Sequence, residues 1–401
     1  GQSFSHVPEQ DAMISCIMKA CAEAGAAPRL GSYHAEIRTA EGRVLRFESA
    51  WMEERIESKN ELKRALYRAL TELTGKALPW GTLTGIRPAK LALTRLQEGK
   101  SADEVRAEFK RDFFLSDARN ELCVRTAENE LRAIRGLDFS TGYSLYIGIP
   151  FCPTTCLYCS FPSYPIGSKK STVYLAALKE EIRLVAELMA EKRLDAIYVG
   201  GGTPTSLSAA ELEDLLGFVR GLFDLSALRE FTVEAGRPDS ISREKLIVLK
   251  EQGADRISIN PQTLKQETLD LIGRFHTVDQ FTESFRLARE LGFDNINTDL
   301  IMGLPNESEA DVRRTMEGIR ALSPDDVTIH SLALKRAARL NTKREDYADV
   351  SYGDANRMVE LASSYCEEMG LSPYYLYRQK NMAGNLENVG WCKKGKEGLY
   401  N

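Results

Sequence analysis

Several features are scarce or missing in this 401-residue sequence. No stretch comes near the roughly 18 consecutive apolar residues that a membrane-spanning helix requires, and no basic segment followed by an apolar run opens the chain. The net charge is −5, and no basic cluster marks a surface for nucleic acid or for an anionic membrane. These absences predict a cytoplasmic protein without membrane insertion and without nucleic acid as a partner.

Cysteine is also scarce, because eight cysteines in a chain of this size are too few for a disulfide framework. Three of the eight fall within eight residues, at Cys152, Cys156 and Cys159. This clustering predicts a metal centre in a reducing compartment. The other five are dispersed, at Cys16, Cys21, Cys123, Cys366 and Cys392. We expect these to be small buried or partly exposed thiols, with the first two on one helix.

From residue 144 onward, β-rich runs alternate with amphipathic segments. The predicted strands are residues 144–149, 196–200, 230–234, 256–259, 295–301 and 326–332. The predicted helices are residues 172–191, 209–222, 243–252, 278–291 and 309–322. This alternation predicts an α/β fold with consecutive parallel strands and crossover helices, forming a partial six-stranded β/α barrel. In such a barrel the functional residues follow the strands, at their carboxyl ends.

The segments on either side of the repeat predict two further modules. Residues 1–140 are expected to form an N-terminal α+β module, with a hairpin over 34–48 and helices over 58–73 and 117–134. The barrel is expected over residues 141–340. Residues 341–401, with a helix near 354–369, are expected to form all or part of a C-terminal module.

The cysteine triplet follows the first predicted strand, so three thiolates are expected to meet on a loop at the barrel mouth. Three protein ligands leave one position open, whereas a structural zinc site or an electron-transfer cluster has four. The open position favours a reactive metal centre. Buried thiols or an incomplete zinc knuckle are the alternatives.

The spacing C-x3-C-x2-C, with Tyr158 directly before the last cysteine, resembles the signature of radical S-adenosylmethionine (SAM) enzymes. Residues 146–152 and 200–205 are more closely similar to the oxygen-independent coproporphyrinogen III oxidases. Motifs at 233–235, 255–263, 273–276 and 297–305 fit the same group in the same order. The N-terminal module and the ending 379–390 resemble the longer branch of that group, of coproporphyrinogen dehydrogenase type.

This resemblance implies the cofactors and the residues that bind them. Cys152, Cys156 and Cys159 would hold a [4Fe-4S] cluster whose unique iron binds SAM. One electron from an external donor such as flavodoxin or ferredoxin would then cleave SAM to a deoxyadenosyl radical. The positions that match a first SAM site are Tyr146, Gly201 and Glu234. Those that match a second SAM site are Tyr158, Gly202, Thr203, Gln262, Arg274, Asp299 and Ala333.

Several of these residues have plainer interpretations. The glycines at 200–202 also suit a tight turn after a strand, Glu234 suits a solvated charge, and Arg274 suits a surface ion pair. Asp299 lies within an apolar run, where its carboxylate must be hydrogen-bonded or functional to offset desolvation. One SAM molecule or two are both compatible with the sequence.

The same group acts on a tetrapyrrole with four propionates, which requires local cations in a substrate pocket. The candidates are Arg274, Lys335, Arg336, Arg378 and Lys380. Tyr374, Tyr375 and Tyr377 suit either a core or a stacking surface for the macrocycle. His276 and His330 suit either proton transfer or a structural role.

Two positions beside the cysteine triplet depart from the oxidases: Gly148 stands where they have a His, and Phe161 where they have a fourth Cys. The resemblance implies oxidative decarboxylation of coproporphyrinogen III to protoporphyrinogen IX in anaerobic haem biosynthesis. The two departures keep open a haem-binding chaperone of the same family and radical chemistry on another tetrapyrrole.

Overall fold

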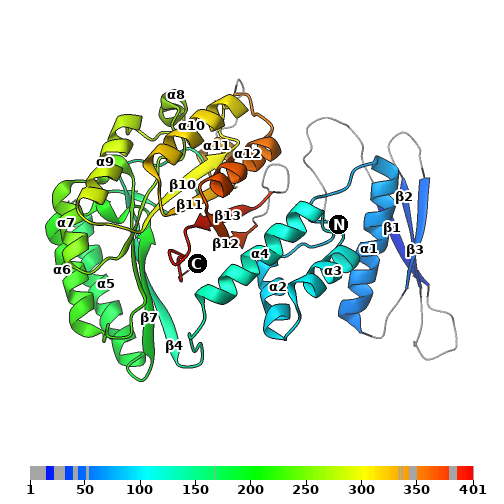
Figure 1. Ribbon diagram of the computed structural model, residues 1–401, viewed down its shortest axis with the longest axis horizontal. Helices are drawn as coiled ribbons and strands as arrows, with labels where there is room; N and C mark the ends of the chain where they lie inside the picture. Colours follow the sequence, from blue (N-terminus) through cyan, green and yellow to red (C-terminus); the bar gives the residue numbers. More distant parts are fainter. Residues whose placement is uncertain are drawn as a thin grey trace. The chain divides into compact units, whose positions relative to one another are not determined.

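The computed structural model describes residues 15–21, 32–38, 44–50, 54–166, 168–333, 335, 337–342, 350–378 and 386–400. The chain divides into two compact units, Gly1–Gly85 with Arg95–Val124 and Ile86–Thr94 with Arg125–Asn401 (Figure 1). Helices α2 (Pro88–Gln97) and α4 (Asp117–Ala133) each contribute residues to both units. The three-module division at residues 140 and 340 stays a prediction.

The first unit contains a three-stranded antiparallel sheet in the order β1 (Ser15–Cys21), β2 (Ser32–Arg38), β3 (Val44–Ala50). Helix α1 (Arg55–Thr74) contacts β3, and α3 (Ala102–Phe113) begins with a capping box between Ser101 and Glu104. The expected hairpin and helices are confirmed. The placement of Cys16 and Cys21 on one helix is wrong, because both lie in β1, which pairs with β2 along its whole length. A run this short is ambiguous between helix and strand from periodicity alone, and pairing with the next strand along the chain makes it a strand.

In the second unit, the six predicted barrel strands are confirmed. They are β4 (Gly142–Ile149), β7 (Arg193–Gly201), β8 (Glu230–Gly236), β9 (Arg256–Ile259), β10 (Ile296–Met302) and β11 (Asp326–Ser331). Each pairs in parallel with the next in this order, and together they form the curled half-barrel that the sequence predicts. Their carboxyl ends therefore meet at one edge of the sheet.

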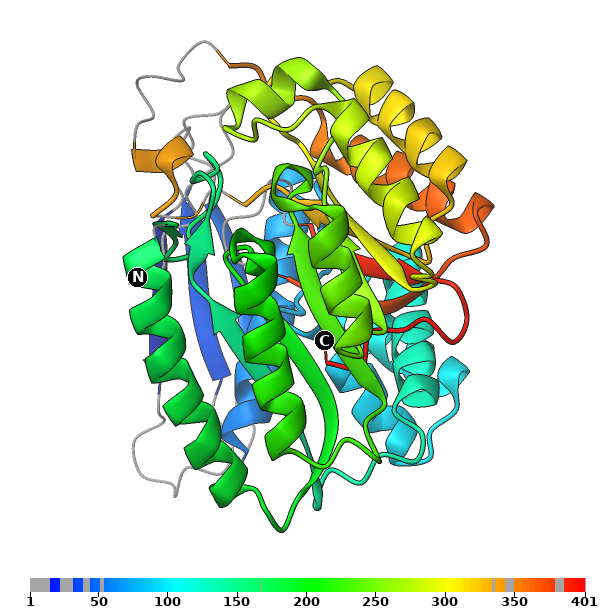
Figure 2. The same ribbon diagram turned by 90° about the vertical axis from the view of Figure 1, so that its left-hand side faces the viewer.

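Crossover helices cover one face of this sheet. The expected helices are confirmed as α5 (Ser168–Leu188), α6 (Ala209–Leu222), α7 (Arg243–Glu251), α9 (Val278–Glu290) and α10 (Glu309–Leu322). Figure 2 shows α5, α6 and α7 side by side in front of the sheet. Ser208 and Thr277 cap α6 and α9, which explains why both helices begin at the expected residues. Short turns η1 (Pro204–Ser206) and η2 (Pro238–Ser240) and helix α8 (Gln266–Leu271) occupy the loops after the strands.

The C-terminal part of the chain extends the same sheet. After α11 (Arg339–Thr342) and α12 (Ala355–Glu368), strands β12 (Ser372–Tyr377) and β13 (Asn388–Cys392) pair antiparallel to each other, and β13 pairs antiparallel to β11. The buried Tyr374 hydroxyl donates to Asp326 at 2.7 Å, and Asp326 forms a 2.6 Å ion pair with buried Arg256. Tyr374 is therefore a core residue. Within the described ranges, every helix falls short of the length or the hydropathy that crossing a membrane would demand.

Candidate active site

The cysteine loop begins where β4 ends. Cys152 closes strand β5 (Phe151–Cys152), which pairs with β6 (Tyr164–Pro165), and the other two cysteines follow in the loop between these strands. Leu157 is buried in an apolar cluster and fixes the loop, because its amide donates to the Ile272 carbonyl and its carbonyl accepts from the Leu340 amide, both at 2.9 Å. Cys156 is buried, and its two companions are partly exposed.

Two of the three thiols, Cys152 and Cys159, have raised pKa values. Burial raises the pKa of Cys152 and of Cys159, and the neighbouring Cys156 raises both further. A hydrogen-bonding contact of 3.4 Å between Cys152 Sγ and Thr203 Oγ1 acts in the opposite direction. Among the described residues, no three Cys, His, Asp or Glu side chains are placed as ligands of a single metal ion. A four-iron cluster binds each cysteine through a different iron, so it does not require the three thiols to converge on one ion.

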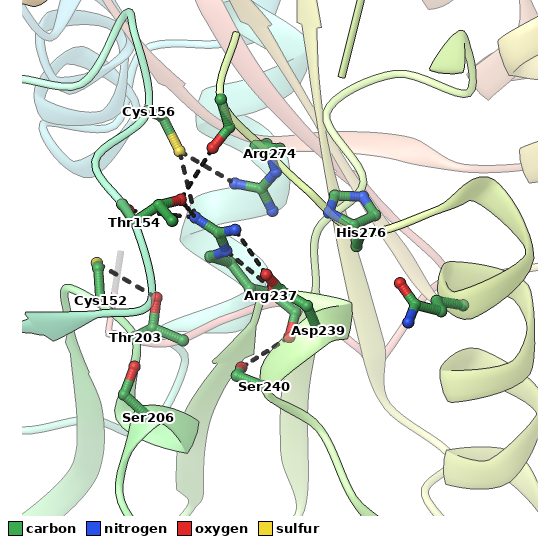
Figure 3. Close-up of polar contacts among 12 residues, drawn as sticks. Cys152, Thr154, Cys156, Thr203, Ser206, Arg237, Asp239, Ser240, Arg274 and His276 are labelled. Atoms are coloured by element: carbon green, nitrogen blue, oxygen red, sulfur yellow. Dashed lines mark hydrogen bonds and ion pairs between the residues drawn. The ribbon is translucent and has the colours of Figure 1, made fainter. Parts of the chain in front are cut away.

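Two buried guanidinium groups face Cys156. Nη1 of Arg237 and Nη1 of Arg274 each lie 3.9 Å from Cys156 Sγ (Figure 3). Arg237 follows β8 and Arg274 follows α8, so two different loops bring positive charge to the same sulfur. A negatively charged group is the favoured occupant of such a place. Sequence reasoning missed Arg237, although its position directly after a barrel strand was a usable signal.

Arg274 is 5% exposed, so the interpretation as a surface ion pair is wrong. Its Nη1 donates to the Tyr158 hydroxyl at 3.4 Å, and its Nη2 donates to the Asn260 carbonyl. Its Nε is buried without a partner. Arg274, Tyr158 and Thr203 thus lie at the cysteine loop, as a cofactor role would require.

The glycine turn after β7 lies directly against this loop. The Gly202 amide donates to the Ile149 carbonyl at 2.8 Å, and the Thr203 amide donates to the Phe151 carbonyl at 2.7 Å. A Cβ at Gly202 would lie 2.6 Å from the Phe151 carbonyl oxygen, and Gly201 has a φ of 110°. Close backbone packing therefore requires these glycines, whatever ligand they also approach.

Side chains from three neighbouring strands contact one another in turn. Tyr146 of β4 stacks on Tyr198 of β7 with ring centroids 5.9 Å apart, and the Tyr198 hydroxyl donates to Glu234 Oε1 of β8 at 2.6 Å. Burial raises the pKa of Glu234 to about 7, against the lowering effect of the Tyr198 hydrogen bond. Tyr198 was not among the expected residues, because nothing in its local sequence separates it from a core tyrosine.

Asp299 of β10 continues this line. It accepts hydrogen bonds from Asn260 Nδ2 at 2.9 Å and from Asn297 Nδ2 at 2.8 Å, and its Oδ2 lies 3.7 Å from His330 Nε2. Burial would raise the pKa of Asp299, but His330 and the amide donors outweigh burial and lower it. The hydrogen bonding expected of a carboxylate in an apolar run is therefore present.

The other expected residues have mixed placements. Gln262 has a φ of 71°, its amide donates to the Asp299 carbonyl at 3.1 Å, and its Oε1 is buried without a partner. Ala333 is 9% exposed just after β11. His276 is fully buried and neither ring nitrogen has a hydrogen-bond partner. Burial and the nearby Arg274 lower its pKa to about 3, so His276 is neutral.

The candidate substrate cations are only partly described. Arg336 and Lys380 lie outside the described residues. Lys335 Nζ lies 5.6 Å from the centre of the Phe161 ring, and Arg378 is buried. The dispersed Cys123, Cys366 and Cys392 are buried free thiols, as expected.

Comparison with known proteins decides the family. Residues 146–319 match the Radical SAM superfamily. The chain is 42% identical over 349 residues to the oxygen-independent coproporphyrinogen-III oxidase-like protein HemZ of Bacillus subtilis, covering 86% of this chain and 70% of that protein. The chain belongs to the radical SAM superfamily. Within it, the chain belongs to the coproporphyrinogen III oxidase-like group, and the superfamily's cofactors are a [4Fe-4S] cluster and SAM.

Two further similarities place this radical SAM protein among its relatives. It is 40% identical over 193 residues to the heme chaperone HemW of Bacillus subtilis, covering 48% of this chain and 51% of that protein. Coproporphyrinogen III oxidase (HemN) from Escherichia coli has a similar fold, with a TM-score of 0.55 and 24% identity over 66% of this chain and 58% of that one. The chain thus spans only about half to three fifths of these two relatives.

Proposed function

We propose that this protein catalyses the oxidative decarboxylation of coproporphyrinogen III to protoporphyrinogen IX, with a [4Fe-4S] cluster on Cys152, Cys156 and Cys159. The observation that carries the cluster assignment is the thiol triplet at the ends of the barrel strands, with two buried guanidinium groups against its central sulfur. The similarity to a coproporphyrinogen-III oxidase-like protein over 349 residues supports the substrate.

The proposed SAM-binding residues fall into two groups. Tyr146, Gly201 and Glu234 would bind a first molecule, and Glu234, with its pKa near 7, accepts or donates hydrogen bonds according to its protonation. The proposed second group consists of Arg274, Tyr158, Gly202, Thr203, Gln262, Asp299 and Ala333. The unpaired donor of Arg274 and the unpaired acceptor of Gln262 support ligand binding there, because buried polar atoms are normally satisfied.

When bound, the cluster and SAM would supply a carbon radical able to take a hydrogen atom from a substrate propionate, and loss of CO2 with transfer of one electron to an external acceptor would complete each vinyl group. The chain's own residues hold and shield the reacting groups. The buried Leu157 anchors the cysteine loop, and the backbone of the glycine turn after β7 donates hydrogen bonds to Ile149 and Phe151 just before that loop. Lys335, whose Nζ lies 5.6 Å from the centre of the exposed Phe161 ring, would pair with a propionate. The tetrapyrrole and an external electron donor such as flavodoxin or ferredoxin are the proposed partners. A cytoplasmic location is part of the proposal, since free thiols and a cluster need a reducing compartment.

The test is an anaerobic assay of the reconstituted protein with coproporphyrinogen III, SAM and a reductant. We expect protoporphyrinogen IX to form, and Cys156→Ala to lose both the visible absorption of the cluster and the product. The matched control is Cys123→Ala, which removes a buried thiol from α4 and should leave the cluster intact. Cleavage of SAM without any vinyl product would contradict the proposed substrate.

A haem chaperone is the second candidate, and Gly148 favours it. A Cβ at Gly148 would meet only the Tyr146 ring, at 3.4 Å, so packing does not require glycine where the oxidases have a His. Phe161 is exposed beside Lys335, where the oxidases have a fourth Cys. Similarity to HemW covers about half of the chain.

Haem titration with transfer to an apo-acceptor separates the two functions. A chaperone is expected to retain haem stably and to pass it on without turning over a porphyrinogen. If the protein fails to retain haem, the chaperone function is excluded. Mass spectrometry of the products covers a third outcome, radical chemistry on another tetrapyrrole.

A further inference from the structure

Arg237 is a buried residue whose side chain is held on every side. Its Nε and Nη2 donate to the two carboxylate oxygens of Asp239 at 3.0 and 2.7 Å. Its Nη1 donates to Thr154 Oγ1 at 2.7 Å and to the Thr154 carbonyl at 3.2 Å, and also faces Cys156 Sγ at 3.9 Å. Figure 3 shows the guanidinium lying between Asp239 and the cysteine loop. It is therefore a fixed group rather than a mobile arm.

Arg274 differs from Arg237 in one decisive respect. The Nε of Arg274 has no partner, so this residue keeps a donor for a ligand. Every nitrogen of Arg237 already has a protein partner. The protein thus engages each nitrogen of Arg237, and this residue gives the loop its charge and its hold on Thr154.

The charge of Arg237 is only partly compensated by Asp239. The Arg237 side chain is 2% exposed, whereas the Asp239 side chain is 21% exposed. Water therefore screens the carboxylate more strongly than it screens the guanidinium. Within this ion pair, the guanidinium contacts the cysteine loop. The net electrostatic effect of the pair at Cys156 is therefore positive.

We propose that Arg237 is a positioning residue that fixes the cysteine loop and raises the reduction potential of the cluster bound there. This inference rests on the proposed cluster assignment. Reduction adds one negative charge to a cluster, and a buried cation beside a ligand sulfur stabilises the more negative state. The same guanidinium holds Thr154, whose hydroxyl donates to the Gly273 carbonyl at 2.9 Å and links the loop to the segment carrying Arg274.

The test is a redox titration of the anaerobically reconstituted protein, followed by visible absorption and by the paramagnetic signal of the reduced cluster. Arg237→Gln removes the charge and is expected to lower the equilibrium constant for reduction about tenfold, which is about 59 mV for a one-electron couple. Asp239→Asn removes the compensating anion and is expected to shift the potential in the opposite direction. Arg237→Lys keeps the positive charge but loses the paired hydrogen bonds of the guanidinium to Asp239, and it should retain most of the wild-type reduction potential.

Two control variants separate charge from position. Thr154→Val removes a hydrogen bond of Arg237 without changing charge, and is expected to lower cluster content while leaving the potential near that of the wild type. Arg243→Gln makes the same substitution at a half-exposed arginine of α7. This variant should change neither the cluster content nor the reduction potential. A purely structural role for Arg237 would lower cluster content in several variants without opposite shifts in potential.

The outcomes distinguish this inference from the proposed function. If the wild-type protein binds no cluster, or if Cys156→Ala binds as much iron as the wild type, the cluster assignment fails. If the cluster forms but Arg237→Gln and Asp239→Asn both leave its potential unchanged, the role of Arg237 is refuted and the proposed function stands. Arg237→Lys and Asp239→Asn keep the test decisive if Arg237→Gln does not fold.

Discussion

Replacing Glu234 by Gln should make the cofactor-free protein more stable at alkaline pH. Glu234 lies at the end of β8 beside the Tyr198 hydroxyl, and burial raises the pKa of Glu234 from 4.5 to about 7. Between these values the folded state holds a proton that the unfolded chain has released. The contribution of Glu234 to the free energy of unfolding is therefore highest below about pH 4.5 and is lost as the pH rises through about 7.

The size of this effect follows from the same shift. Each tenfold change in proton affinity corresponds to about 1.4 kcal/mol, so full ionisation of Glu234 would cost about 3 kcal/mol. Glu234 is partly exposed, and water reduces the cost. We expect Glu234→Gln to exceed the wild type by about 2 kcal/mol at pH ~8 and to match it at pH ~5.

The measurement is urea unfolding of both proteins without cofactors, at several values from about pH 5 to about pH 8.5. Glu307 provides a matched control, because it is buried, accepts a 2.5 Å hydrogen bond from Thr263, and also has a pKa raised to about 7. Glu307→Gln should show the same gain at high pH, whereas only Glu234→Gln should weaken SAM binding. If the wild type and Glu234→Gln lose stability in parallel as the pH rises, the reasoning about Glu234 is refuted.

Two further predictions concern packing and charge. Asp326→Asn should destabilise the protein by about 3–5 kcal/mol in urea unfolding, because it leaves the Arg256 guanidinium buried without its counter-ion; an unchanged midpoint would show that this pair is not needed. Gly202→Ala should cost about 1–3 kcal/mol and lower cluster content, since its methyl group would lie 2.6 Å from the Phe151 carbonyl oxygen. Gly221→Ala in α6, where a methyl group meets open space, should instead stabilise by about 0.5–1 kcal/mol in thermal unfolding; equal effects at the two glycines would contradict this account.

The barrel could be predicted because its signals are local. Each strand is a short apolar run, and Ser208 and Thr277 mark helix starts through side-chain caps that the sequence displays. The antiparallel strands β12 and β13 were not predicted, because their pairing with β11 depends on contacts between distant segments. The strand containing Cys16 and Cys21 was assigned to a helix, although it pairs with the next strand along the chain.

The candidate site shows the same division between local and distant information. The cysteine spacing and the glycine turn are visible as motifs, whereas the burial of a particular arginine is not. Arg237 and Arg243 are six positions apart and chemically identical, yet the side chain of Arg237 is 2% exposed and that of Arg243 is 52% exposed. Only the path of the loop after β8 brings one of them to Cys156.

The two carboxyl groups on the sheet differ in what they can bind, although both are only partly exposed. Asp299 has two amide donors and His330, which keep its pKa low, so it stays anionic and attracts a cation. Glu234 accepts hydrogen bonds from the Tyr198 hydroxyl and from the Gly201 backbone, but burial outweighs both, and its pKa near 7 lets it exchange a proton at physiological pH. A ligand with hydroxyl donors beside Glu234 would offset the desolvation that raises its pKa. Binding of such a ligand should therefore lower the pKa of Glu234 and release a proton near neutral pH, so that affinity rises with pH through about 7.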